Sequence, residues 1–384
     1  MTQAIPTWDL AVRATGFHRH TAELSRTNLW TSRLGWTVPY VYDTIEAEHA
    51  ALRSACAISD RTPLAVYAVS GRDAAAFLDR AAGGCGGNVA VGASRRVVLC
   101  DDDGALIADG LVQRPGRDEW LLTLPLRLRD HLEASAIGFS VEIADLMQTT
   151  ACLAVEGPSA CAALLSSGLG GIEALRPGGV RRMKLGLTEV TIARVTPTGG
   201  LGYELRIAAD DADWLWGRIR RGGEAFNMRP AGEAALDLAR LEAGHPRCGI
   251  DYTSALDAAP AERRSPFSLG LASLVALDGQ PFTGRRALLE ERSRGASRAL
   301  VGVVSHDPEV AGGQAGDCPG RYRRAAARHV PGSCARDCGQ AQVRGPDRAP
   351  PLCRAPQRPP DPARRDVKNF ARRDGPVPRQ RSTR

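Results

Sequence analysis

The sequence predicts an α+β fold of two or three domains whose strands are mostly antiparallel. Apolar runs that alternate in the β manner occur in pairs joined by short turns, as in VVLC-DDDG-ALIADGLV over residues 97–112. An Asp-Gly pair between apolar runs is a strong hairpin signal. Segments of helical period lie between these pairs, which favours α+β over a doubly wound parallel sheet. A chain of 384 residues is long enough for several domains.

The first expected helix covers residues 42–59, because Ile45, His49, Leu52 and Cys56 recur on one side. Asp43 or Thr44 is its expected cap. The remaining helices are expected from apolar periodicity and stop signals such as Gly244 followed by Pro246. The expected elements in order are a strand at 64–69, a helix at 72–81, a meander at 96–123, a helix at 128–137, β structure at 141–155, a helix at 211–226, and a helix that starts at 232 and is ended by Gly244.

Residues 194–207 read RVTPTGGLGYELRI and predict a β-hairpin with a Gly-rich turn. This turn is expected to deliver Tyr203 and Glu204 to one place. The alternative is an ordinary hairpin with Glu204 in solvent. Residues 1–40 carry no clear pattern. His18 and His20 alternate on an expected extended segment without nearby carboxylates or Cys, so no metal site is predicted.

Charge is distributed unevenly along the chain. Residues 311–384 contain 16 Arg, one Lys and six Asp, a net of +11, so the remaining residues carry −4 of the overall +7. The body therefore gives no electrostatic case for nucleic-acid binding. Six scattered Cys in the body, without a C-x-x-C pair, predict buried free thiols. No apolar run reaches about 18 residues and no signal peptide is recognisable, so we expect a cytoplasmic protein that does not span a membrane.

Several segments resemble the aminomethyltransferase family, which includes the glycine cleavage system T-protein and folate-dependent demethylases. The similar segments are EHAALRSACAISD, VSGRDAAAFLDRA, GALIADGLV, EGPSACAALLSSG, TGGLGYE, GEAALDLARLEAGHP and SPFSLGLASLVALDGQPFTGRRALLEE. The resemblance covers residues 40–306. It implies an antiparallel cloverleaf with a folate-binding α+β part at 1–60 and 145–308, and an inserted antiparallel α+β subdomain at 61–144.

The resemblance also implies tetrahydrofolate as the acceptor of a one-carbon unit. Glu204 occupies the family position that pairs with the amino-pyrimidine edge of the pterin, and Tyr203, Gly202 and Arg240 are further expected folate contacts. Asp109 is the expected catalytic residue. The donor is expected to be a small methyl or aminomethyl compound, with a carrier protein as a further candidate partner.

Three positions depart from the T-protein pattern. Ala108 stands where the family has the first Asp of a pair, Leu124 replaces a folate-contacting Asn, and Leu236 replaces an Arg. Neighbours on a strand face opposite sides, so Asp109 replaces the missing Asp only if a bulge re-aims it. These departures favour a divergent demethylase. A folate-binding protein without catalysis and an inactive family member remain alternatives.

Residues 309–384 are expected to form a Pro- and Arg-rich disordered tail where the family has a C-terminal β-barrel. From residue 311 the chain has no Ile, a single Leu and 11 of its 25 Pro. Such a composition does not bury a core. We interpret this change as a frameshift near residue 310; the alternative is a basic tail that binds RNA or acidic partners.

Overall fold

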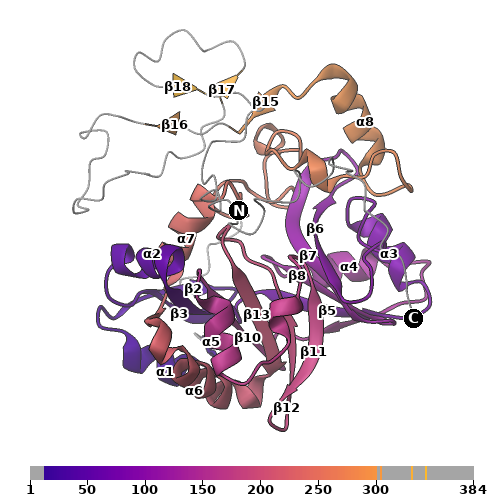
Figure 1. Cartoon of the computed structure of the whole chain (residues 1–384). Helices are drawn as coiled ribbons and strands as arrows, with labels where there is room; N and C mark the ends of the chain where they lie inside the picture. The colour runs from indigo at the N-terminus through magenta and orange to yellow at the C-terminus, as the bar shows by residue number, and fades with distance from the viewer. Residues whose placement is uncertain (1–12, 301–302, 305–329, 332–341, 344–384) are drawn as a thin grey trace, which may run out of the picture. The chain divides into compact units, whose positions relative to one another are not determined.

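The computed structural model describes residues 13–300, 303–304, 330–331 and 342–343 (Figure 1). Two larger sheets and one small sheet, each accompanied by helices, confirm the α+β class. Strands 15–18 are two residues long: β15 (Arg298–Ala299), β16 (Val303–Val304), β17 (Val330–Pro331) and β18 (Gln342–Val343). Apart from β17 and β18, the predicted tail at 309–384 lies outside the described residues.

The described N-terminal segment forms a three-stranded sheet and one helix. These elements are β1 (Arg13–Ala14), α1 (His18–Leu24), β2 (Leu29–Arg33) and β3 (Trp36–Val41). The expectation that His18 and His20 lie on an extended segment is wrong, because both belong to α1. Tertiary packing explains this: the His18 ring lies 5.1 Å from the Trp30 ring, and the His20 ring stacks on Trp216 at 5.9 Å.

A six-stranded sheet has the order β11-β12-β13-β10-β4-β14. All its neighbours are antiparallel except β4 and β14. Side chains alternate across β4, so Cys56 and Ile58 join the core under α5 and α6, whereas Ala57 packs with α2 and α7. The strands of this six-stranded sheet are β4 (Cys56–Asp60), β10 (Thr150–Glu156), β11 (Val180–Leu185), β12 (Thr188–Ala193), β13 (Gly202–Ala208) and β14 (Met228–Pro230). The helices beside it are α2 (Ile45–Ser54), α5 (Ala160–Ser166), α6 (Ala212–Gly223) and α7 (Glu233–Glu242).

The helix expected at 42–59 is too long, because α2 ends at Ser54 and residues 56–60 form β4. Every residue of β4 is buried, and four of them pair with β10, so sheet pairing overrides the helical period. The predicted cap is confirmed for Thr44, whose hydroxyl accepts from the Ala47 N–H at 3.2 Å. The predicted hairpin of β12 and β13 is also confirmed.

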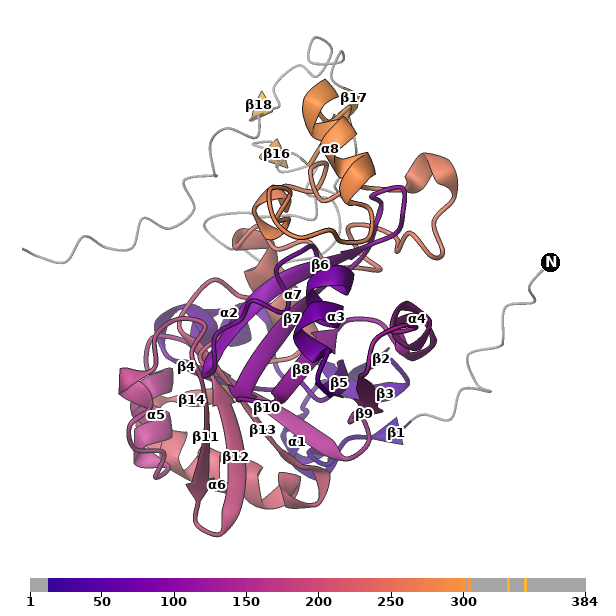
Figure 2. The same cartoon turned by 90° about the vertical axis from the view of Figure 1, so that its right-hand side faces the viewer.

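A five-stranded antiparallel sheet has the order β6-β7-β8-β5-β9, and α3 and α4 accompany it (Figure 2). Tyr67, Phe77 and Leu122 belong to its core. The meander predicted at 96–123 is confirmed. The elements are β5 (Ala65–Ser70), α3 (Ala74–Ala81), β6 (Ala93–Cys100), β7 (Leu106–Gly116), β8 (Glu119–Leu124), α4 (Arg129–Ser135) and β9 (Glu142–Asp145).

A bulge in β7 decides which side chains face the neighbouring sheet. Leu99 pairs with Ala108 and Cys100 pairs with Leu106, so Ile107 is the additional residue. Ile107 and Ala108 consequently join the same core, and Asp109 turns to the other side of the strand.

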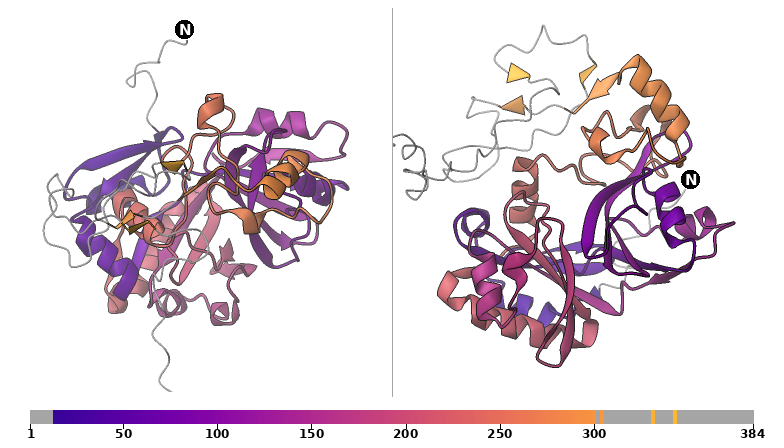
Figure 3. Two further views of the ribbon diagram at one scale, coloured as in Figure 1. Left: turned by 90° about the horizontal axis from the view of Figure 1, so that it is seen from above. Right: turned by 45° about the vertical axis from the view of Figure 1, so that its right-hand side comes forward.

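The segment after α7 packs against the opposite face of β6 and β7. Val98 and Leu106 share a core there with Tyr252, Phe282 and Leu288. Figure 3 shows the orange helix α8 (Arg285–Arg294) beside the purple strands of the five-stranded sheet. Within the described residues, no helix has both the length and the apolar character needed to cross a membrane.

Candidate functional site

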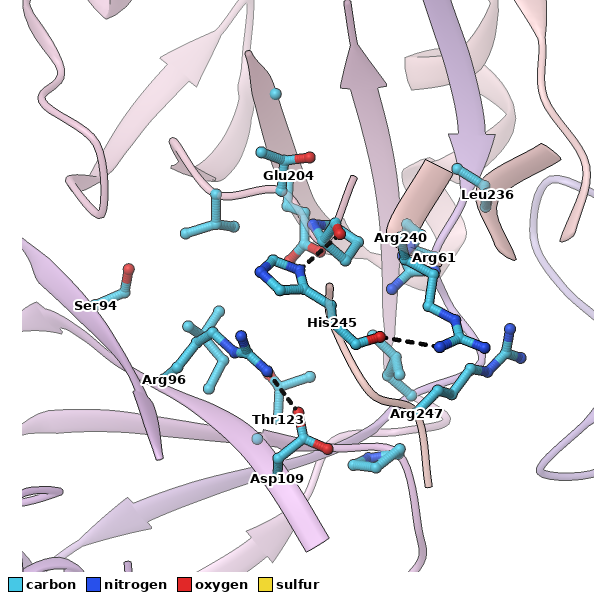
Figure 4. Close-up of a pocket in the computed structure, with 18 of the residues that line it drawn as sticks. Arg61, Ser94, Arg96, Asp109, Thr123, Glu204, Leu236, Arg240, His245 and Arg247 are labelled. Atoms are coloured by element: carbon cyan, nitrogen blue, oxygen red, sulfur yellow. Dashed lines mark hydrogen bonds and ion pairs between the residues drawn. The ribbon is translucent and has the colours of Figure 1, made fainter. Parts of the chain in front are cut away.

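A cavity of about 560 Å³ opens between the two larger sheets (Figure 4). Backbone bonds join the sheets beside it: the Ser94 N–H donates to the Gly178 carbonyl at 2.6 Å, and the Val180 N–H donates to the Gly92 carbonyl at 2.8 Å. The walls come from β6, β7 and the end of β8 on one side. On the other side they come from residues 194–204, α7 and residues 245–248.

The carboxylate of Glu204 on β13 faces this cavity without a hydrogen-bond partner among the described residues. The residue is 8% exposed. Its cross-strand neighbours are the small residues Ala154 and Ala193. Because a buried carboxylate is costly when it lacks hydrogen bonds, this acceptor fits a ligand edge with N–H donors.

Tyr203 does not accompany Glu204 into the cavity, contrary to expectation. It is 1% exposed and belongs to the core beneath α5 and α6. Adjacent residues on a strand face opposite sides, and β13 is regular here. Tyr203 therefore supports the sheet and is not placed to stack on a ligand.

Gly202 lines the cavity, and its missing side chain lets polar groups approach β13. A Cβ at this position would lie 2.7 Å from the Thr196 Cβ and 3.1 Å from the Glu156 Cγ. Glu156 Oε1 accepts from the hydroxyls of Thr196 and Thr198, whereas its buried Oε2 has no hydrogen-bond partner among the described residues. Burial raises the pKa of Glu156, although both hydroxyls and Arg61 oppose this effect.

Arg61 supplies positive charge beside these carboxylates. Its buried Nε lacks a hydrogen-bond partner among the described residues, and the residue lines the cavity. Burial would lower its pKa, but the charges of Glu233, Glu204 and Glu156 outweigh this and raise the pKa. Arg61 thus interacts with three carboxylates, of which Glu204 lines the cavity.

Asp109 faces the cavity from β7, as the bulge requires. Its Oδ2 accepts from Arg96 Nη2 at 3.0 Å, and its Oδ1 accepts from the Tyr252 hydroxyl at 2.8 Å. Ala108 lies on the other face of β7, in the core. Only the second position of the expected Asp pair therefore reaches the site in this chain.

Arg240 lines the cavity but is held by other residues of the protein. Its Nε donates to Asp237 at 2.8 Å, its Nη1 donates to the His245 carbonyl at 2.9 Å, and it also pairs with Asp251. Its guanidinium is largely buried. The expected folate contact therefore belongs first to the network that shapes the loop after α7.

Arg247 extends this network to the N-terminal sheet. It pairs with Glu233 at 2.9 Å, and Glu233 accepts from Arg33 Nη1 at 3.0 Å. Burial would raise the pKa of Glu233, but Arg33 and Arg247 hold it below the ordinary value. The network thus connects β2, α7 and the loop at residues 245–248.

His245 enters the cavity where α7 ends. Gly244 adopts φ +69° at this end, and Pro246 follows. His245 Nδ1 lies 2.7 Å from the Pro197 carbonyl oxygen. Burial lowers the pKa of His245, and nearby Arg96 lowers it further.

Sequence reasoning missed Arg61, Arg96, His245 and Arg247. None of these residues is a fixed position of the motifs on which the prediction depended. They come from three segments that are far apart in the chain: Arg61, Arg96, and the loop with His245 and Arg247. His245 stands at a position that the LEAGxP pattern leaves open. Leu124 and Leu236 were singled out, and both line the cavity as apolar wall.

Comparisons with known proteins agree on one family. Residues 19–278 match the model described as the GCVT N-terminal domain. The aminomethyltransferase of Streptomyces coelicolor is 32% identical over 293 residues, which cover 73% of this chain and 75% of that protein. That of Bacillus subtilis is 30% identical over 275 residues, covering 70% and 74%. Glycine cleavage system aminomethyltransferase T from Bartonella henselae has a similar structure, with a TM-score of 0.66, 25% identity and coverage of 76% and 78%.

Proposed function

Because the chain belongs to the aminomethyltransferase family of the glycine cleavage T-protein, whose fold it shares, we propose that it transfers a one-carbon unit to tetrahydrofolate. Glu204 carries this proposal. Its carboxylate is an unsatisfied acceptor that lines a cavity of about 560 Å³.

The residues present fit the amino-pyrimidine edge of a folate. A carboxylate accepts two parallel N–H bonds, each charge-assisted and worth about 1.5–3 kcal/mol. The positive charge of Arg61 interacts with Glu204, and Ala154 and Ala193 leave room beside that carboxylate. Gly202 and the apolar Leu124 and Leu236 complete the walls. The folate supplies the nitrogen that receives the one-carbon unit.

Asp109 is the proposed catalytic carboxylate, and Tyr252 and Arg96 hold it in place. Both of its oxygens already accept a hydrogen bond, so its position is fixed before any ligand arrives. A carboxylate fixed at the cavity wall stabilises positive charge on a reacting amine.

The proposed donor is a small methylated amine, which makes the chain a divergent demethylase. Leu124 and Leu236 give the cavity apolar surface where the T-protein pattern has polar side chains. An aminomethyl donor on a carrier protein is the competing candidate. Both donors require the folate site around Glu204.

A calorimetric titration of the purified chain with folinate tests the proposal. We expect micromolar affinity. A screen of methylated amines with tetrahydrofolate should then yield transfer of the methyl group. Folinate binding without transfer from any donor would favour a non-catalytic folate-binding protein, and absence of binding would contradict the proposal.

A further inference from the structure

We propose that His245 is the proton acceptor of this site: its Nε2 receives the N–H, and then the proton, of the ligand nitrogen that takes up the one-carbon unit. This inference rests on the proposed one-carbon transfer. It assigns a catalytic role to a residue that none of the expected site residues include.

The tautomer of His245 follows from its hydrogen bond. The Pro197 carbonyl oxygen, 2.7 Å from Nδ1, can only accept a hydrogen bond. Nδ1 must therefore carry the proton, and the neutral ring keeps a lone pair on Nε2. Nε2 has no hydrogen-bond partner among the described residues, and the residue lines the cavity.

The ring lies between the two carboxylates of the site. Figure 4 shows His245 between Glu204 and the Arg96–Asp109 pair, with its second nitrogen on the side away from Pro197. A ligand that donates N–H groups to Glu204 and extends towards Asp109 therefore passes this nitrogen. A proton acceptor must come within hydrogen-bond reach of the proton that it removes.

The charged groups around His245 favour the neutral imidazole. The charged and titratable residues from other elements that line the cavity are Arg33, Arg61, Arg95, Arg96, Asp109, Arg194 and Glu204. Those from its own segment are Arg240, Arg247 and Cys248. Burial lowers the pKa of His245, Arg96 and Arg240 add to this, and Asp109 and the Pro197 bond oppose it. The imidazole is consequently free to accept a proton at neutral pH.

Every proton in the proposed step is accounted for. The ligand nitrogen forms a bond to the one-carbon unit and loses its N–H bond, and the proton moves to Nε2. The donor amine departs with the electron pair of its broken C–N bond and takes the proton from the imidazolium. No electron is gained or lost, so the step needs no oxidant.

Two substitutions separate a role in the cavity from a role in the loop. In H245N the amide nitrogen can still donate to Pro197 from the position of Nδ1, but nothing replaces Nε2. In H245Q the amide reaches the position of Nε2, but it does not accept a proton. H131Q is the matched control, because His131 is half-buried and lines a different cavity, and burial likewise lowers its pKa.

Calorimetry with tetrahydrofolate between pH 5.5 and 7.5 measures the first readout. We expect the affinity of the wild type and of H131Q to fall as the pH decreases, because the imidazolium no longer accepts the ligand N–H. The fall at pH 5.5 should be smaller than the roughly tenfold loss that an ordinary histidine pKa of about 6.5 would give, because the pKa of His245 is lowered. H245Q should bind within about threefold of the wild type at pH 7.5 without this pH step, and H245N should bind about tenfold more weakly. With a donor from the screen, H245Q should lower kcat by about 100-fold and leave KM nearly unchanged.

Nitrogen-15 spectra of the histidine rings give a second readout without ligand. The signals that disappear in H245Q should show a protonated Nδ1 and an unprotonated Nε2 at pH 7.5. A protonated Nε2 would overturn the inference, as would wild-type affinity in H245N or a persistent pH step in H245Q. Absence of tetrahydrofolate binding by the wild type would contradict the proposed function together with this inference. Binding by the wild type with any of the outcomes just named would contradict the inference alone, so the two failures are distinguishable.

Discussion

Tyr252 and Asp109 bond to each other in both directions. The Tyr252 hydroxyl donates to Asp109 Oδ1 at 2.8 Å and accepts from the Asp109 backbone N–H at 3.0 Å. Burial raises the pKa of Tyr252 and the Asp109 charge raises it further, so the hydroxyl stays protonated throughout the working pH range. This contact fixes the side chain that the β7 bulge turns into the cavity, and it ties the loop after α7 to the five-stranded sheet.

Tyr252→Phe should lower the free energy of unfolding by about 1–3 kcal/mol, because it leaves the Asp109 N–H and one carboxylate oxygen without this partner. Urea unfolding at pH 7 measures the change. Tyr40→Phe, at an exposed side chain, should stay within about 0.5 kcal/mol of the wild type. Equal changes in the free energy of unfolding for the two substitutions would show that the contact between Tyr252 and Asp109 does not stabilise the fold.

Ala108→Asp should destabilise the chain by about 3 kcal/mol or more, even though the T-protein pattern has Asp at this position. Ala108 is 0% exposed and packs in the core of the five-stranded sheet, where a carboxylate has no partner. Leu187→Asp, in the exposed turn between β11 and β12, is the control. A stable Ala108→Asp variant with tighter folinate binding would show that residue 108 reaches the cavity.

The positions of Ala108 and Asp109 also show how much of the structure could be predicted from the sequence. Periodicity and turn signals predicted the β6–β8 meander, the β12–β13 hairpin and α7, because local patterns agree there with the tertiary structure. The family resemblance predicted Glu204 as a site residue, and the structure places it in the cavity wall. The bulge lies directly before Ala108, so Ala108 and Asp109 still face opposite sides of β7: residue 108 lies in the core, and Asp109 reaches the cavity from its own position.

Other features depend on packing between distant segments. Residues 56–60 become β4 because β10 pairs with them, although the helical period continues into Cys56. His245 and Arg61 become site residues only when α7 and β4 meet β13 at one cavity. Tyr203 was misplaced because the motif GYE was interpreted as one unit, whereas a strand separates its members onto two faces.

Glu156→Gln should stabilise the chain at pH 7 relative to the wild type. Glu156 is 1% exposed, and burial raises its pKa. A raised carboxyl pKa means that the folded state holds the proton more tightly than the unfolded chain, so wild-type stability falls as the pH rises from about 4.5 through the folded pKa. The advantage of the variant should therefore grow across this window and vanish below it.

Urea unfolding at several pH values between 4.5 and 8 measures this difference. The hydroxyls of Thr196 and Thr198 can donate to the amide oxygen as they do to Glu156 Oε1. An advantage that is constant with pH would indicate that the wild-type carboxyl does not change its proton binding on folding.

The buried thiols should resist alkylation in the folded chain at pH 8. Burial raises the pKa of Cys56 and Cys152 to about 12, and burial raises that of Cys248 to about 11. Because the thiolate is the reactive form, labelling should be slow in buffer and complete in urea. Peptide mapping by mass spectrometry follows each residue. Rapid labelling of Cys248 in buffer would mean that the loop after α7 opens.

The most direct test of the folate site compares Glu204→Ala with Glu189→Ala in calorimetric titrations with folinate. Glu189 lies on the neighbouring strand β12 and pairs with Arg182 at the surface. Loss of two charge-assisted hydrogen bonds should reduce the affinity of Glu204→Ala by about 100-fold or more, whereas Glu189→Ala should bind like the wild type. Unchanged affinity of Glu204→Ala would remove Glu204 from the site and contradict the proposed function at its centre.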